Sequence, residues 1–188
     1  MGWESIQPSN GAVLSSNSQT FRANVDVYSS PRSQTSAKIL FSTNQTIIDN
    51  ATWDTSGGVW CSWASVDDDI VSVYLSNYDL SWVSQGATVY YKFFCKYLWG
   101  SFNTEEIHSS GTYSFVMQRP PTAPSLQSPS NNLGSRPISQ NISWSRGSYG
   151  TSQKIYFGTD SGASNIVNGA TISSSATSYN PGTLNYST

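Results

Sequence analysis

The chain has 188 residues, of which 11% are charged and 13% are aromatic, and its formal net charge at pH 7 is −2. So many aromatic side chains at so low a net charge exclude an intrinsically disordered chain, and nine Lys plus Arg with a pI near 5.1 argue against nucleic acid as a partner. The abundance of Ser, Thr, Asn and Tyr favours strands and turns over helices, so we expect an all-β protein.

Residues 1–5 contain no basic segment followed by an apolar stretch, so they do not form a signal peptide. No run of about 18 apolar residues occurs, which predicts no membrane insertion. We expect an extracellular or cell-surface protein whose signal was removed or replaced, or a component of a virion fibre that leaves the cell inside a phage particle.

Alternating apolar and polar residues, bounded by Gly, Pro, Asn and Ser, predict six or seven short strands in the first 118 residues. The expected strands are 11–14, 20–28, 38–42, 58–64, 70–75, 88–97 and 112–117. In the second of these, Phe21, Ala23 and Val25 alternate with polar residues, so one face is buried and the other is wet. This number of strands indicates a Greek-key β-sandwich.

Short segments of the first half recur, in the same order, in the second half of the chain. The matches are residues 8–10 with 129–131 and 19–23 with 140–144 at a shift of 121, 38–43 with 154–159 at 116, 51–53 with 170–172 at 119, and Leu80 with Leu184 at 104. Small changes of shift correspond to loops of different length between equivalent strands. The conserved order predicts a duplication.

The proline-rich segment 119–123 lies between the two copies, and proline holds a chain extended. We therefore expect a first domain over residues 1–118, a linker over 119–123 and a second domain over 124–188.

The second copy combines a proline-led start over residues 124–129 with the segments 142–144, 154–159 and 179–184. These segments resemble the fibronectin type III family, within the immunoglobulin-like β-sandwiches. The resemblance implies tandem sandwiches in which Trp144 packs in a core. It also implies that Leu80 joins Tyr90 or Tyr91 in a tyrosine corner of the first copy.

The two copies differ at two places. The second contains no counterpart of residues 86–91, which makes it a partial sandwich of strands A to E. Either the chain belongs to a longer, multi-repeat polypeptide, or a partner donates the missing strands by β-augmentation. The first copy carries an insertion near residues 54–69, and an insertion that the sister copy lacks is a candidate for a specialised surface.

The insertion holds the candidate glycan-contact residues Trp60 and Trp63, which with Trp82 and Trp99 would stack on sugar rings if exposed. The alternative is that these rings pack within the sheet. Because Trp60 and Trp63 are three positions apart on one strand, they face opposite sides, and at least one should be outside.

Asp67, Asp68 and Asp69 form a weak candidate calcium site, although acids at a strand edge also act against aggregation. No other cofactor or metal is expected. Cys61 and Cys95 are either a disulfide bridge across 34 positions or two separately buried thiols.

Enzyme activity is not expected. His108 lies in a predicted loop with no nucleophile to serve, and Glu105 and Glu106 are neighbours that keep a loop soluble. Glycosylation sequons occur at Asn44, Asn50, Asn141 and Asn185, a number expected by chance in a chain this rich in Ser and Thr.

These observations predict a non-enzymatic structural or adhesive module, a repeat of a surface protein, filament or virion fibre. Its partners would be neighbouring copies or adjacent repeats, and possible glycans. The alternative is an accessory carbohydrate-binding module of a larger secreted enzyme.

Overall fold

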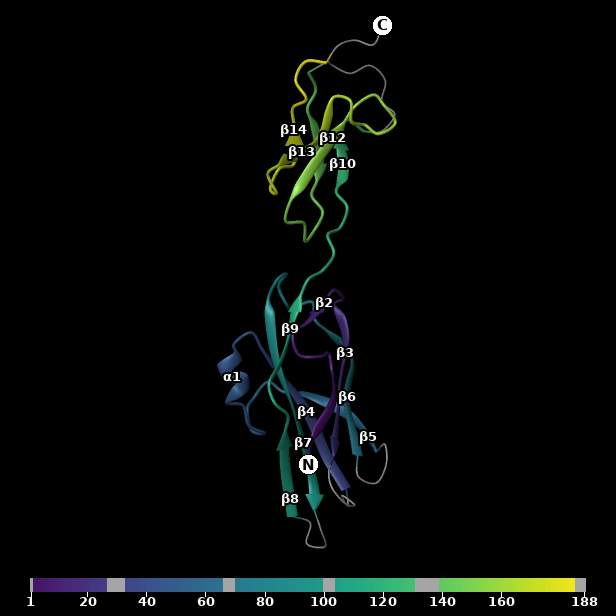
Figure 1. Ribbon diagram of the computed structural model, residues 1–188. Coiled ribbons are helices and arrows are strands. Elements are labelled where there is room, and N and C mark those ends of the chain that lie inside the picture. The colour runs from purple at the N-terminus through teal and green to yellow at the C-terminus, as the bar shows by residue number, and fades with distance from the viewer. Residues whose placement is uncertain (1, 27–32, 66–69, 100–103, 131–138, 185–188) are drawn as a thin grey trace. The chain divides into compact units, whose positions relative to one another are not determined.

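The computed structural model describes residues 2–26, 33–65, 70–99, 104–130 and 139–184. Within these ranges the protein is all-β, as predicted, with fourteen strands and one short helix (Figure 1). No helix in this part of the chain has the length and apolar character needed to cross a membrane. The chain folds as two compact units, unit 1 over Met1–Arg119 and unit 2 over Pro120–Thr188.

Unit 1 is a single curled sheet with one helix. Its elements are β1 (Trp3–Gln7), β2 (Ala12–Leu14), β3 (Ser18–Asp26), β4 (Ser33–Ser42), α1 (Gln45–Asp49), β5 (Val59–Ser65), β6 (Ile70–Asp79), β7 (Thr88–Trp99), β8 (Thr104–Ser109) and β9 (Tyr113–Met117). The strand order is β1-β3-β6-β5-β4-β7-β9-β2, with β8 paired to β7. Neighbouring strands are antiparallel except β2 and β9, which are parallel.

The curl brings strands that are distant in the sheet into contact. Strand β3 is separated from β7 by three other strands, yet the rings of Phe21 and Tyr91 lie 5.3 Å apart. The predicted inward face is confirmed, because Phe21, Ala23 and Val25 are all fully buried. The Tyr91 hydroxyl donates to the carbonyl oxygen of Pro8, far upstream, so Tyr91 does not make the expected tyrosine corner.

Helix α1, which no pattern in the sequence predicted, covers part of the outer surface of β4 and β7. The Asn44 side chain accepts a hydrogen bond from the Thr46 N–H and caps the helix. Ile48 of the helix then packs on Leu40 and Phe94, forming a second small core. At five residues the helix is too short for a 3.6-residue periodicity to be recognised.

The seven predicted strands of unit 1 are all present, and the structure adds β1 and β8. Strand β8 corrects the expectation that His108 lies in a loop. It forms because β7 is twelve residues long and presents a free edge at its far end, with which β8 pairs from Phe94↔Ser109 to Trp99↔Thr104. Cross-strand pairing with β7, the preceding strand of the chain, outweighs the weak strand propensity of the glutamates.

Unit 2 contains two small sheets. Its strands are β10 (Ser125–Ser128), β11 (Ile142–Ser145), β12 (Gln153–Phe157), β13 (Val167–Ile172) and β14 (Ser178–Tyr179). Strands β10, β11 and β14 form one sheet, and β12 and β13 form the other. Trp144 is buried, as the resemblance implied, and its indole N–H donates to Gln153 Oε1 over 3.0 Å, which joins the two sheets.

The strand pairings of the two units follow the sequence matches. In unit 1, Glu4 pairs with Asn24 and Gln7 with Arg22; in unit 2, Ser125 pairs with Ser145 and Ser128 with Ser143, and all four positions are displaced by 121. The pairs Phe21↔Leu75 and Ile142↔Tyr179 likewise follow the shifts of 121 and 104. Equivalent positions of the two units therefore pair in the same register.

One match is wrong. Strand β12 pairs with residues 170–172, and its equivalent β4 pairs with residues 59–61 rather than with 51–53. Residues 51–53 instead follow helix α1, so their likeness to 170–172 is local and not structural. Since 20 positions separate Ile39 from Val59 but only 15 separate Ile155 from Ala170, five of the extra residues of the first copy lie between β4 and β5, the stretch that contains α1, rather than all within the predicted 54–69.

Candidate functional site

The two ends of unit 1 are joined by the parallel β2–β9 pair. Its register is Ala12↔Phe115, Val13↔Val116 and Leu14↔Met117. Hydrogen bonds flank the pair on both sides: Gly11 N donates to the Ser114 carbonyl over 2.8 Å, and Gln118 N donates to the Leu14 carbonyl over 2.7 Å. The first and last parts of the unit are therefore held side by side.

Arg119 closes the carboxyl end of unit 1. Its guanidinium is buried and donates to the carbonyl oxygens of Leu80 and Val83, each over 2.8 Å, and to the side chain of Asn17. Arg119, the first residue of the predicted linker over 119–123, lies in the first unit. The fixed fork of an arginine suits several carbonyls at once, but sequence alone does not show which carbonyls will converge.

The candidate glycan contacts Trp60 and Trp63 are both exposed, at 64% and 44%, and so is Trp82. Trp60 lies opposite Lys38 on β4, whereas Trp63 lies opposite Val73 on β6, so the two do not form one platform. The side chain of the fourth candidate, Trp99, is outside the described residues.

Trp60 instead contacts Trp53, which was not among the predicted glycan contacts. Their ring centroids are 5.9 Å apart and the planes are inclined at 60°. A hollow of about 290 Å³ beside Trp53 is lined by Ala51, Thr52, Asp54, Phe94, Ile107 and Ser109. Because the two rings are not coplanar, this surface offers one ring face at a time to a ligand.

Lys38 organises the loop that carries Trp53. Its ammonium donates to the Trp53 carbonyl and, over 3.2 Å, to the Thr55 carbonyl, and it stands 5.0 Å from the Trp53 ring centroid. Burial lowers the pKa of Lys38. Gly58 lies against this side chain, since a Cβ at that position would be 2.8 Å from the Lys38 Cδ.

Cys61 and Cys95 are free thiols, so the expected bridge is not formed in this structure. Both residues are register partners of Ala37, one from β5 and one from β7. Two strand spacings, about 9 to 10 Å, therefore separate their backbones, which is beyond the reach of a disulfide. Burial raises the pKa of each thiol to about 12.

His108, Tyr97 and Glu106 form a compact polar group on β7 and β8. The Tyr97 hydroxyl is 2.7 Å from His108 Nε2 and donates to Glu106 Oε2 over 3.1 Å, while the imidazole stacks on the phenol ring. Glu105 pairs separately with Lys96 at 2.6 Å. The two neighbouring glutamates thus have different partners.

The acidic run Asp67, Asp68 and Asp69 lies outside the described residues. In the part of the chain that the structure describes, no group of three His, Cys, Asp or Glu is placed to hold a metal ion. The sequon residues Asn44, Asn50 and Asn141 are exposed, and Asn44 caps α1. Asn185 is outside the described ranges.

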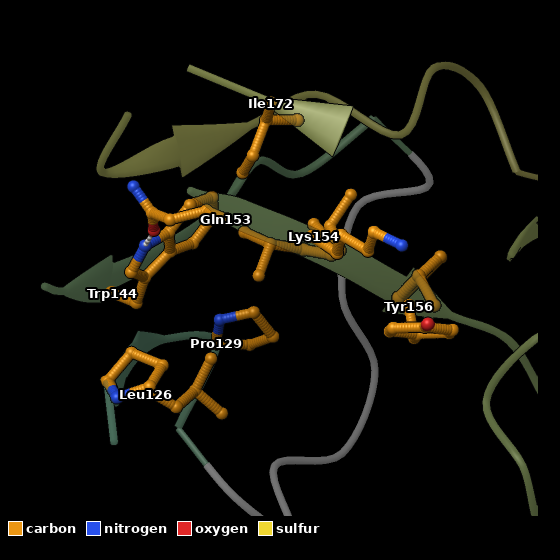
Figure 2. A pocket seen from close by; sticks show the side chains of 11 residues that line it. Leu126, Pro129, Trp144, Gln153, Lys154, Tyr156 and Ile172 are labelled. Carbon is orange, nitrogen blue, oxygen red and sulfur yellow. Dashed lines mark hydrogen bonds between the residues drawn. The ribbon is translucent and has the colours of Figure 1, made fainter. Parts of the chain in front are cut away.

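Unit 2 contains a hollow of about 370 Å³ between its two sheets (Figure 2). Its lining is Pro124, Leu126, Pro129, Ile142, Trp144, Gln153, Lys154, Ile155, Tyr156, Phe157 and Ile172. Figure 2 shows Leu126 and Pro129 on one side and strand β12 on the other. Most of these side chains are apolar, so the hollow is an open core rather than a polar cleft.

No family model, curated protein or solved structure matches this chain. Its function is therefore inferred from the geometry of its own residues.

Proposed function

We propose that this chain is a non-enzymatic structural or adhesive module of a surface protein, extracellular filament or virion fibre. In this proposal its units are immunoglobulin-like sandwiches similar to fibronectin type III domains, arranged in tandem. The matched pairing registers of the two units support a duplication, and duplicated units are typical of chains that extend by adding repeats. Adjacent repeats would then be its first partners.

The observation that carries the proposal is the parallel β2–β9 pair. If the ends of unit 1 are pulled apart, β2 is drawn toward its amino end and β9 toward its carboxyl end. In a parallel pair these directions slide one strand along the other, so all the hydrogen bonds between them are loaded together. The Asn10 side chain accepts hydrogen bonds from the Ser114 N–H and hydroxyl, which strengthens the connection between the β2 and β9 segments.

Other contacts support a structural rather than a catalytic role. His108 shares its ring nitrogen with Tyr97 and Glu106, and the stack on Tyr97 covers one face of the imidazole. The buried Arg119 ties the last residue of unit 1 to carbonyls of Leu80 and Val83, so a force applied there reaches the body of the sheet.

Single-molecule stretching of the whole chain tests the proposal. Unit 1 should unfold in one step that releases about 400 Å of chain, since each extended residue spans about 3.5 Å. A Val13→Cys, Val116→Cys variant places two cysteines at register partners of β2 and β9, where a disulfide can join them. When oxidised it should remove about 360 Å from that step, and reduction should restore the full length. Unfolding of unit 1 without a measurable force would contradict the proposal.

A second function, that of an accessory carbohydrate-binding module, is favoured by one observation. Trp53 lines the hollow together with Ile107, and the exposed Trp60 contacts the Trp53 ring. On a glycan array, this function predicts binding that Trp60→Ala abolishes. Trp63→Ala, on a different part of the sheet, should leave the binding intact. Retained binding in Trp60→Ala would exclude this surface.

A further inference from the structure

Strand β12 is paired on one side only. In the described residues of unit 2 it belongs to a two-stranded sheet whose other member is β13. Five successive residues of β12, from Gln153 to Phe157, line the hollow of Figure 2. Side chains of a strand alternate between its faces, so a single face offers only every second residue. The hollow therefore extends along the edge of β12 that is not paired with β13.

Unit 1 shows what the equivalent edge binds. Strand β4, which matches β12 at a shift of 116, pairs with β5 on one side and with β7 on the other. Strand β7 places Phe93 opposite Ile39 and Tyr91 opposite Phe41, and both of these β7 rings are fully buried. The described part of unit 2 has a counterpart of β5 in β13, but none of β7.

We propose that the edge of β12 and the adjoining hollow are a strand-acceptor site. The ligand is an extended polypeptide segment of the β7 type, with aromatic or aliphatic side chains at every second position, that adds to β12 in antiparallel orientation. This inference rests on the repeat relationship in the proposed function. The backbone of the segment would satisfy the edge of β12, and its apolar side chains would fill the hollow.

The register of unit 1 specifies the fit. Since Ile39 and Phe41 correspond to Ile155 and Phe157, the residues of the added strand that meet these two must be large and apolar. Both Ile155 and Phe157 are half-buried, whereas Lys154 and Tyr156, the two neighbours of Ile155, are exposed. The neighbouring positions of the added strand therefore tolerate charge.

A synthetic peptide with the sequence of residues 88–97, carrying Cys95→Ser, tests the site on the 188-residue chain. The readout is amide hydrogen exchange at β12. At a peptide concentration ten times the dissociation constant, exchange there should slow about elevenfold while exchange in unit 1 stays unchanged. Absence of slowing at any soluble concentration of peptide would overturn the proposal.

Two further peptides of matched composition decide the register. Replacing Tyr91 and Phe93 by Asp puts charges toward the hollow and should abolish the slowing. Replacing Tyr90 and Phe94 by Asp changes the same residue types on the other face and should preserve it. Equal loss with both peptides would overturn the proposed register and with it the site.

Two protein variants provide an independent check. Ile155→Asp should abolish binding, whereas Thr171→Asp on the exposed side of β13 should not. If sedimentation shows that the chain alone dimerises and that β12 is protected in the dimer, the ligand is a second copy and the proposal is overturned. A missing peptide effect alongside an intact force step in unit 1 would remove this inference and leave the proposed function standing.

Discussion

Units 1 and 2 have corresponding strand pairs but very different interiors. Of the 21 buried hydrophobic side chains among the described residues, 20 lie in unit 1 and the other is Trp144. Ile39 is fully buried, while its counterpart Ile155 is half-buried beside an open hollow. Equivalent strands in equivalent register thus do not by themselves make a core.

The difference lies in the strands that close unit 1. Strands β7 and β9 contribute Tyr91, Phe93 and Phe115, which contact Phe21 or its neighbours from across the curl. Unit 2 has no described strand in their place, and a hydrogen bond from Trp144 to Gln153 links its two sheets beside the open hollow. Burial of apolar area, rather than the number of strand pairs, therefore separates the two units.

Hydrogen exchange should show the largest contrast. Strand β4 is paired on both sides, so its amides should open only with global unfolding, at a free energy of about 5 to 15 kcal/mol. Amides of β12, with one neighbour, should open at a cost of about 2 kcal/mol or less. Exchange resolved by NMR measures both in one sample, and equal protection would mean that unit 2 is closed.

Matched truncations sharpen the contrast in packing. Ile39→Ala should cost about 2 to 5 kcal/mol of unfolding free energy, because it leaves a cavity in a fully buried site. Ile155→Ala removes the same atoms from a half-buried site and should cost about 1 kcal/mol or less. Denaturant titration with separate probes for each unit measures both, and equal costs would refute the difference in burial.

Two equivalent lysines test the polar part of the comparison. Lys38→Ala should destabilise unit 1 by about 1 to 3 kcal/mol, because the Trp53 and Thr55 carbonyls lose a charged donor. Lys154→Ala, at the exposed counterpart, should change stability by less than about 0.5 kcal/mol. Thermal melts of the two variants and the parent chain provide the measurement, and a larger loss in Lys154→Ala would be inconsistent with its exposure.

Alkaline pH should weaken unit 1 specifically, because both cysteines lie in it. Burial raises the pKa of Cys95 from 9.0 to about 12, so the folded state keeps a proton that the unfolded state releases. The stability from this group is complete below pH 9 and is lost as pH rises toward 12, by about 1 kcal/mol between pH 9 and 10.

Cys95→Ala should therefore flatten the fall in the unfolding free energy of unit 1 over that window. Denaturant titrations at a series of pH values measure the slope. Cys61→Ala serves as a comparison at a half-buried site. An unchanged slope in Cys95→Ala would show that its thiol is not protonated preferentially in the folded state.

The alternation of residues determined most strands of unit 1, and the internal matches determined which strands of the two units correspond. Both signals can be read directly from the order of residues. A strand shows as an alternation with a period of two, and a duplication shows as segments that recur in the same order. The same alternation placed Phe21, Ala23 and Val25 on the buried face.

Tertiary structure alone decided the contacts between distant segments. The match of 51–53 with 170–172 failed because pairing with β4, not residue likeness, identifies the equivalent strand. The cysteine pair was predicted from two residues, but the intervening strand β4 separates them. The Arg119 contacts likewise depend on long-range partners, whereas strand β8 and the Trp53–Trp60 pair depend on partners nearer in the chain. In each case the propensity of a single residue does not identify the partner that overrides it.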